Sequence, residues 1–177
     1  LTPPMDWNSW NCWARDVTQE QILSSARAMV EKGLADHGWS YINIDDGWQG
    51  RRGGRYNAIQ PNKKFPDMAA LTREIHDMGL RVGIYSTPWI GTYAAHIGSY
   101  SDRPDGENEW IEKGLHNENY RYQKPGGNYW EDRCEVWHHG PYSFVEADVK
   151  QWAEWGIDYL KYDWHPLNYY HVREMFD

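Results

Sequence analysis

A repeated alternation of strand-like and helix-like segments constrains the fold of this chain more than any other feature. The strand-like runs lie at 5–10, 39–44, 80–85 and 157–163. Between them, apolar residues recur at helical spacing, and these stretches stop near Gly33, Gly79 and Gly156. Alternating strands and helices predict a parallel sheet whose strands are joined by right-handed crossovers.

Polar residues mark where the predicted helices begin. Thr18 and Gln21 have the spacing of a capping box, in which each side chain bonds the other residue's backbone N–H. Asp67 is placed to cap the second helix. Ser143 and Glu146 have capping-box spacing before the third helix.

Two α/β architectures fit this order of elements, an open doubly wound sheet and a (β/α)8 barrel of the TIM type. A complete barrel needs about 250 residues, so residues 1–177 would supply its N-terminal half, about four βα units, with 171–177 opening a fourth helix. Such a half barrel leaves two open sheet edges. We therefore expect the C-terminal half of the barrel, or a second copy, to pair there.

Composition narrows the range of functions. The net charge is −8 with no basic stripe, which disfavours a nucleic-acid binder, and no apolar run approaches the roughly 18 residues of a membrane span. The chain has 12 Trp and 13 Tyr but only 3 Phe. Trp and Tyr rings carry a polar group, so they suit partly hydrated surfaces such as sugar-binding sites. Many of them fall in a long connection at 87–141, which we interpret as a pocket wall or as an excursion that packs on itself.

Other motifs are weak. Cys12 and Cys134 allow at most one disulfide, and no charged-then-apolar leader precedes the first strand. His138 and His139 lack the spacing of metal ligands, so we expect no metal and no organic cofactor.

Polar residues gather at the carboxyl ends of the predicted strands, which meet on one edge of a parallel sheet. Lys161 and Asp163 share one face of their strand, because side chains alternate. They suit either an ionised nucleophile beside a cation or a structural ion pair. Asp45 and Asp46 suit binding of sugar hydroxyls, bracing of a loop, or binding of a hard cation.

Together these segments resemble glycoside hydrolase family 27, the α-galactosidase and α-N-acetylgalactosaminidase family. The matching pieces occur in family order over nearly the whole chain outside the aromatic loop. They are 3–5, 7–11, 41–48, 65–66, 76, 79–80, 83–86 and 155–163.

The resemblance implies a retaining hydrolase that removes terminal α-linked galactose through a covalent glycosyl-enzyme. It implies that Asp163 is the nucleophile, and that the acid/base lies beyond residue 177, so the isolated chain would be nearly inactive. The substrate-binding residues that it implies are Asp45, Asp46, Lys161, Trp7, Tyr85 and Trp164. It also favours a periplasmic or secreted location.

Several positions depart from the family pattern. Asp6 stands where the family usually has Gly, and Gly47 stands where many members have Cys. A second common family disulfide is replaced by Tyr93 and His165. The loss of both ends of that disulfide resembles a disulfide-free branch. The runs 85–89 and 162–164 resemble the bacterial branch, which includes relatives acting on β-L-arabinopyranosides and isomaltose-type α-glucosides.

Two functions of other classes stay open at this point. The chain could form a non-catalytic carbohydrate-binding half barrel in which the aromatic loop dominates. It could also be a metal-dependent α/β hydrolase with Asp45, Asp46 and Asp163 as ligands.

Overall fold

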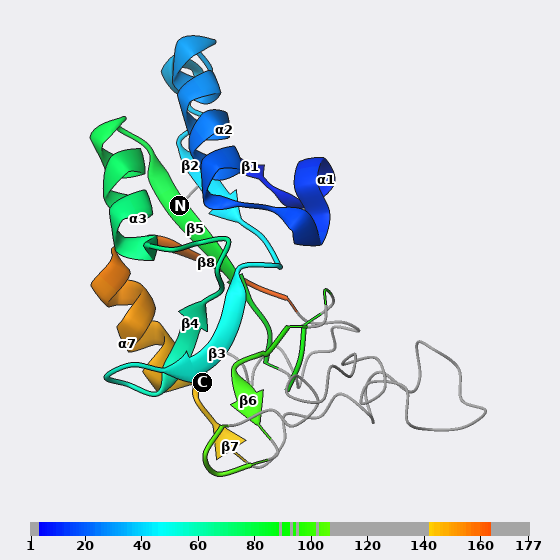
Figure 1. Ribbon diagram of the computed structural model, residues 1–177. Coiled ribbons are helices and arrows are strands. Elements are labelled where there is room, and N and C mark those ends of the chain that lie inside the picture. Colours follow the sequence, from blue (N-terminus) through cyan, green and yellow to red (C-terminus); the bar gives the residue numbers. More distant parts are fainter. Residues whose placement is uncertain are drawn as a thin grey trace, which may run out of the picture.

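A parallel sheet of four strands, in the order β1-β2-β5-β8, forms the centre of the molecule (Figure 1). The structure is a computed structural model that describes residues 4–88, 90–92, 94, 96–101, 103–106 and 142–163. The strands are β1 (Asp6–Asn8), β2 (Tyr41–Ile44), β5 (Arg81–Ser86) and β8 (Tyr159–Tyr162). Every predicted strand is therefore present. β1, β2 and β8 are shorter than their predicted runs, and β5 is shifted by one residue.

The strand order separates the two predicted architectures. Neighbours in the sheet are also consecutive central strands along the chain, so each crossover steps in the same direction. Right-handed crossovers without a reversal place all their helices on one face, as in a barrel, whereas a doubly wound sheet reverses. Figure 1 shows the helices in sequence along the sheet, with contacts between neighbours. They are α2 (Gln19–Glu31), α3 (Met68–Asp77) and α7 (Val145–Trp155).

The helix starts confirm two predictions and correct a third. Thr18 and Gln21 form the complete capping box of α2, and the Asp67 side chain accepts the backbone N–H of Ala70 at 2.8 Å. The box predicted at Ser143 is wrong, because α7 begins after Phe144, which makes no side-chain cap. Ser143 instead belongs to a short strand pair, which fixes its backbone. That pair is β6 (Tyr100–Ser101) with β7 (Tyr142–Ser143).

A hairpin between β2 and α3 was not predicted. Its antiparallel strands are β3 (Gln49–Gly53) and β4 (Ala58–Pro61), and β4 packs against α7. The β3 sequence is polar and rich in glycine and arginine, so it lacks the alternation that reveals a strand. Among the described residues, the other short elements are α1 (Trp10–Trp13) and two 3-10 turns, η1 (Ala14–Asp16) and η2 (Ala35–His37).

The core lies between the sheet and its helices. Ile42 and Ile44 of β2, with Val82 and Ile84 of β5, are fully buried against apolar residues of α2 and α3. Since strand side chains alternate, Asn43 points to the opposite face of β2, and it is buried there too. A Cβ on its register partner Gly83 would lie 2.4 Å from Asn43 Oδ1, so glycine makes room for this amide.

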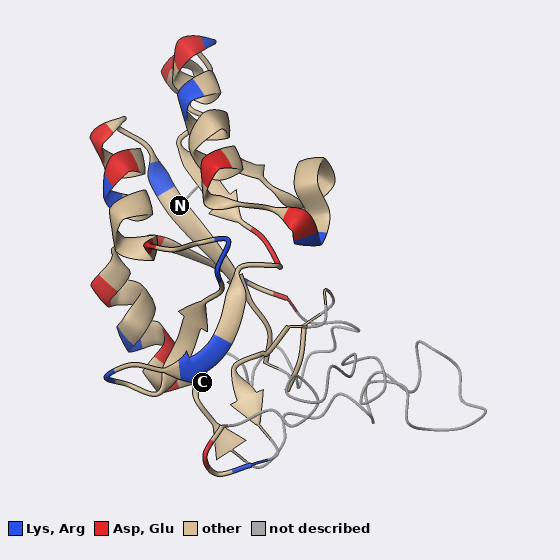
Figure 2. Ribbon diagram, in the orientation of Figure 1, with Lys and Arg blue, Asp and Glu red and all other residues tan. Residues whose placement is uncertain are grey.

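Charged side chains of both signs are interspersed along the outer helices (Figure 2). In the part of the chain that the structure describes, no helix has the length and apolarity to cross a bilayer.

Candidate active site

A cavity opens at the carboxyl ends of the parallel strands, where the sequence predicts a site. Its volume is about 210 Å³. The lining residues lie near the carboxyl ends of β5 and β8 or shortly after β1, β2 and β8, so distant parts of the sequence meet on one rim. They are Trp10, Asp45, Asp46, Tyr85, Lys161 and Asp163.

Asp45 is held by hydrogen bonds from three directions. Its Oδ2 accepts the Asn8 amide at 2.6 Å and the Lys161 ammonium at 2.7 Å. Its Oδ1 accepts the backbone N–H of Asp46 at 2.8 Å, while its own N–H donates to the Ser9 hydroxyl. The carboxylate is only 3% exposed, and the cationic partner offsets the cost of burying its charge.

Lys161 was expected to accompany Asp163 on its own strand. Its ion pair is instead made with Asp45, two strands away, and its ammonium lies 5.3 Å from the centroid of the Tyr85 ring. The shared face of Lys161 and Asp163 nevertheless brings both to the cavity. Lysine thus ties the β8 end to the β2 end of the sheet.

Asp163 has a neutral hydrogen-bond donor beside it. The Tyr85 hydroxyl donates to Asp163 Oδ2 at 3.1 Å. Burial raises the pKa of the Tyr85 phenol well above its ordinary value, and the surrounding carboxylates raise it further. The phenol therefore stays protonated near neutral pH and remains a donor to the carboxylate.

Asp46 is turned away from Asp45 into a loop. Its Oδ1 accepts the Thr92 hydroxyl at 2.8 Å, and its Oδ2 accepts the backbone N–H of Ala94 at 2.6 Å. Burial raises the pKa of Asp46 to about 7, although these two hydrogen bonds oppose the rise. Asp46 thus braces the loop while it also lines the cavity.

The two tryptophans near the end of the first strand have different surroundings, and only Trp7 was expected to bind substrate. Trp7 packs against the hydrophobic core, whereas Trp10, which starts α1, lines the cavity. Alternation places Trp7 on the core side, because the next residue, Asn8, faces Asp45 on the other side of β1. Sequence reasoning missed Asn8 and Trp10, although their place at or just after the end of the first strand was a usable signal. Trp164, Tyr93, His165, Cys134 and the histidine pair at 138–139 lie outside the described residues.

Within the described ranges, no group of three or more His, Cys, Asp or Glu side chains is arranged to hold a metal ion. Asp45 in particular already has an ammonium, an amide and a backbone N–H on its oxygens.

Consecutive parallel strands with a carboxylate-lined cavity at their carboxyl ends define part of an α/β barrel that carries its chemistry on the strand ends. The family model described as alpha galactosidase A (Melibiase_2) matches residues 2–116, more than half of the chain. The chain belongs to this family of glycosidases, the glycoside hydrolase family 27 type.

Similar proteins agree with this assignment. A relative from Neosartorya fischeri named "Probable alpha-galactosidase B" is 33% identical over 165 residues, covering 91% of this chain and 28% of its own. The crystal structure of alpha-galactosidase I from Mortierella vinacea is 31% identical with a TM-score of 0.64, covering 92% of this chain and 31% of that one. A Bacteroides fragilis structure, provisionally assigned as an alpha-galactosidase, is 32% identical with a TM-score of 0.67. The match covers 98% of this chain and 29% of that chain.

The chain therefore spans about 30% of the length of these relatives, which is consistent with a partial barrel. They come from fungi and a bacterium, so the bacterial branch stays a prediction.

Proposed function

We propose that the protein is a retaining glycoside hydrolase that removes terminal α-linked galactose, with Asp163 as its nucleophile. The observation that carries the proposal is the position of Asp163, which lines a cavity with Asp45, Asp46 and Lys161 and accepts a hydrogen bond from Tyr85. An ionised carboxylate with a fixed orientation is the group that retaining hydrolysis needs at the reactive carbon. The names of the relatives support galactose as the sugar.

The mechanism divides the work among these residues. Asp163 attacks the anomeric carbon while a second carboxylic acid, about 5–5.5 Å away, protonates the leaving oxygen. Water, deprotonated by the same group, then releases the sugar with its configuration retained. Asp45 and Lys161 hold the ring hydroxyls, and Trp10 offers an apolar face to its C–H groups. We place the second carboxylic acid on a later strand, beyond residue 177.

The test is Asp163→Asn in the full-length protein, assayed with a nitrophenyl α-galactoside. We expect near-total loss of turnover with galactose binding retained, because the amide preserves shape but cannot attack. The control Asp77→Asn changes an exposed carboxylate at the end of α3 and should leave turnover unchanged. A fluorinated galactosyl donor that traps the covalent intermediate should label the peptide containing Asp163. Unaltered turnover by Asp163→Asn would refute the proposal.

The same assay addresses the alternatives. Wild-type protein that binds galactose without turnover would indicate a non-catalytic binding module, and activity lost on chelation would indicate a metal-dependent hydrolase. A higher kcat/KM for a β-L-arabinopyranoside or an isomaltose-type substrate would change the sugar and keep the mechanism. We further propose that residues 1–177 form the N-terminal half of the barrel, so this segment alone should show almost no turnover.

A further inference from the structure

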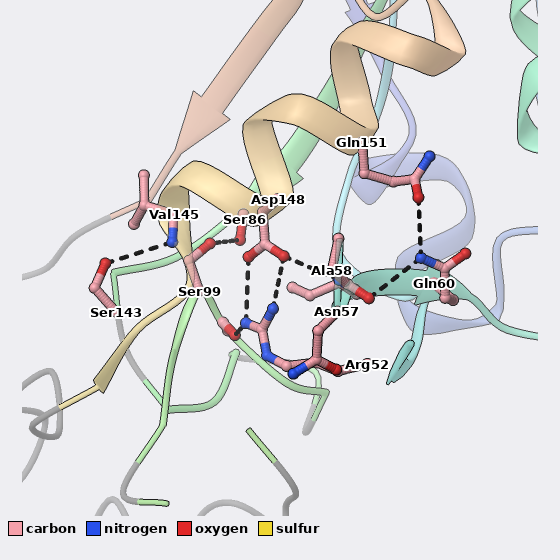
Figure 3. Close-up of polar contacts among 12 residues, drawn as sticks. Arg52, Asn57, Ala58, Gln60, Ser86, Ser99, Ser143, Val145, Asp148 and Gln151 are labelled. Atoms are coloured by element: carbon pink, nitrogen blue, oxygen red, sulfur yellow. Dashed lines mark hydrogen bonds and ion pairs between the residues drawn. The ribbon is translucent and has the colours of Figure 1, made fainter. Parts of the chain in front are cut away.

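A buried ion pair lies apart from the residues that line the cavity. The guanidinium of Arg52, on β3, bonds both oxygens of Asp148, on α7, at 2.6 and 3.2 Å (Figure 3). The two side chains are only 2% and 0% exposed. Charges removed from water this completely are costly to retain, and a buried pair is weak evidence for stability by itself. Stability alone therefore does not explain why the Arg52–Asp148 pair is buried at this place.

The pair joins three separate segments. Arg52 also donates to the carbonyl of Gly98 at 2.7 Å, and its guanidinium lies 4.3 Å from the centroid of the Phe144 ring. Asp148 accepts the backbone N–H of Ile59, on β4, at 2.9 Å. The hairpin, the loop after β5 and the start of α7 are thus fixed to one another by one arginine and one carboxylate.

From this pair, a chain of contacts reaches the proposed nucleophile. Arg52 holds the carbonyl of Gly98, and the hydroxyl of the next residue, Ser99, lies 2.9 Å from the Ser86 hydroxyl (Figure 3). Ser86 ends β5, and its carbonyl accepts the backbone N–H of Asp163 at 3.0 Å. Ser86 is also the register partner of Tyr162, the residue before Asp163. The position of the end of β8 therefore depends on Ser86. The position of Ser86 depends in turn on Ser99 and the buried ion pair.

We propose that Arg52 and Asp148, acting through Ser99 and Ser86, are positioning residues that fix the Asp163 backbone at the cavity. The proposal rests on the proposed function, in which Asp163 is the nucleophile. Its physical basis is that a displacement of about 1 Å at a reacting group can reduce the rate by about 10²-fold, so a buried, multiply bonded support has a direct effect on turnover.

The experiment measures kcat, KM and melting temperature for Asp148→Asn and Ser99→Ala in the full-length protein. Active sites are counted with the trapping fluorosugar. We expect Asp148→Asn to lower kcat per active site by about 10-fold or more, with KM within about twofold, because the sugar-binding side chains keep their own contacts. Ser99→Ala removes one oxygen from the same path and should lower kcat by about threefold or more. Arg52→Lys, which keeps the charge but loses the fork, should give an intermediate kcat.

The matched control is Glu74→Gln, which breaks the exposed Arg27–Glu74 pair between α2 and α3 and should leave kcat unchanged. A purely structural role would lower the melting temperature and the number of active sites while leaving kcat per active site at the wild-type value. That result in the folded variants would overturn the proposal. If Asp148→Asn does not fold, Ser99→Ala and Ser86→Ala decide the question by the same criterion. Turnover retained in Asp163→Asn would instead reject the proposed function, so the two failures are distinct.

Discussion

The hydroxyl of Tyr85 donates a hydrogen bond to the carboxylate of Asp163 across 3.1 Å. Tyr85 is the register partner of Lys161, two residues before Asp163, so the contact reaches diagonally from β5 to the end of β8. Because burial raises the pKa of the phenol, this donor persists over the working range of a hydrolase.

Tyr85→Phe keeps the ring and removes only the donor. We expect kcat to fall by about 10-fold, because the hydroxyl no longer orients the carboxylate. Steady-state kinetics of both proteins on a nitrophenyl α-galactoside measure this. An unchanged kcat in Tyr85→Phe would show that the hydroxyl does not influence the reacting group.

Trp10 and Trp7 should respond differently to the same substitution. Trp10 lines the cavity, so Trp10→Leu should raise KM by about 10-fold and leave the unfolding midpoint near the wild-type value. Trp7 packs on the core, so Trp7→Leu should cost about 1–3 kcal/mol of unfolding free energy with little change in KM. Urea denaturation and steady-state kinetics on both variants provide the comparison. The reverse pattern would show that Trp7 is the ring that contacts substrate.

Asp46 and His96, which lies in the loop that Asp46 braces, should make the unfolding free energy depend on pH in opposite directions. Burial raises the pKa of Asp46 to about 7, so between about pH 4 and 7 the native state binds more protons than the unfolded state, and stability falls as pH rises. Burial lowers the pKa of His96 to about 4, so from there to about pH 6.5 the unfolded state binds more protons, and stability falls as pH drops. Asp46→Asn should therefore make stability rise more steeply with pH, and His96→Gln should do the opposite. Urea midpoints across this range test both signs, and parallel curves for the three proteins would contradict them.

Gly47 has both a positive φ and a crowded Cβ position, and comparison with two other glycines separates the effects of the two. Its φ is +119°, and an added Cβ would lie 2.8 Å from the carbonyl oxygen of Arg15. Gly79 has φ +80° with open space around it, and Gly53 has no positive φ, with its nearest contact at 3.8 Å. We expect substitution by Ala to lower the unfolding free energy by about 1 kcal/mol at Gly79 and by about 2–4 kcal/mol at Gly47, with the smallest effect at Gly53. Equal losses at Gly47 and Gly79 in urea denaturation would show that the Arg15 loop moves aside freely, as a cysteine at position 47 would also require.

The order of the main elements and the edge that carries the site followed from sequence. Apolar runs ending in polar residues predicted the four parallel strands, and the capping signals at Thr18 and Asp67 were confirmed. These signals are local, because periodicity and capping depend on residues within a turn or two. The box at Ser143 failed because a strand pairing with a distant segment took over the backbone of that residue.

Pairings between distant segments were decided by the tertiary structure alone. Sequence placed Lys161 beside Asp163, but the fold brings Asp45 within 2.7 Å of its ammonium. It also joins Arg52 to Asp148, 96 positions apart, through a hairpin whose sequence carries no strand pattern. An ion pair forms wherever packing brings opposite charges together out of water, and spacing along the chain holds no record of that distance. The sequence thus determined which chemical groups reach the rim of the sheet, and the three-dimensional packing determined which of them hold one another in place.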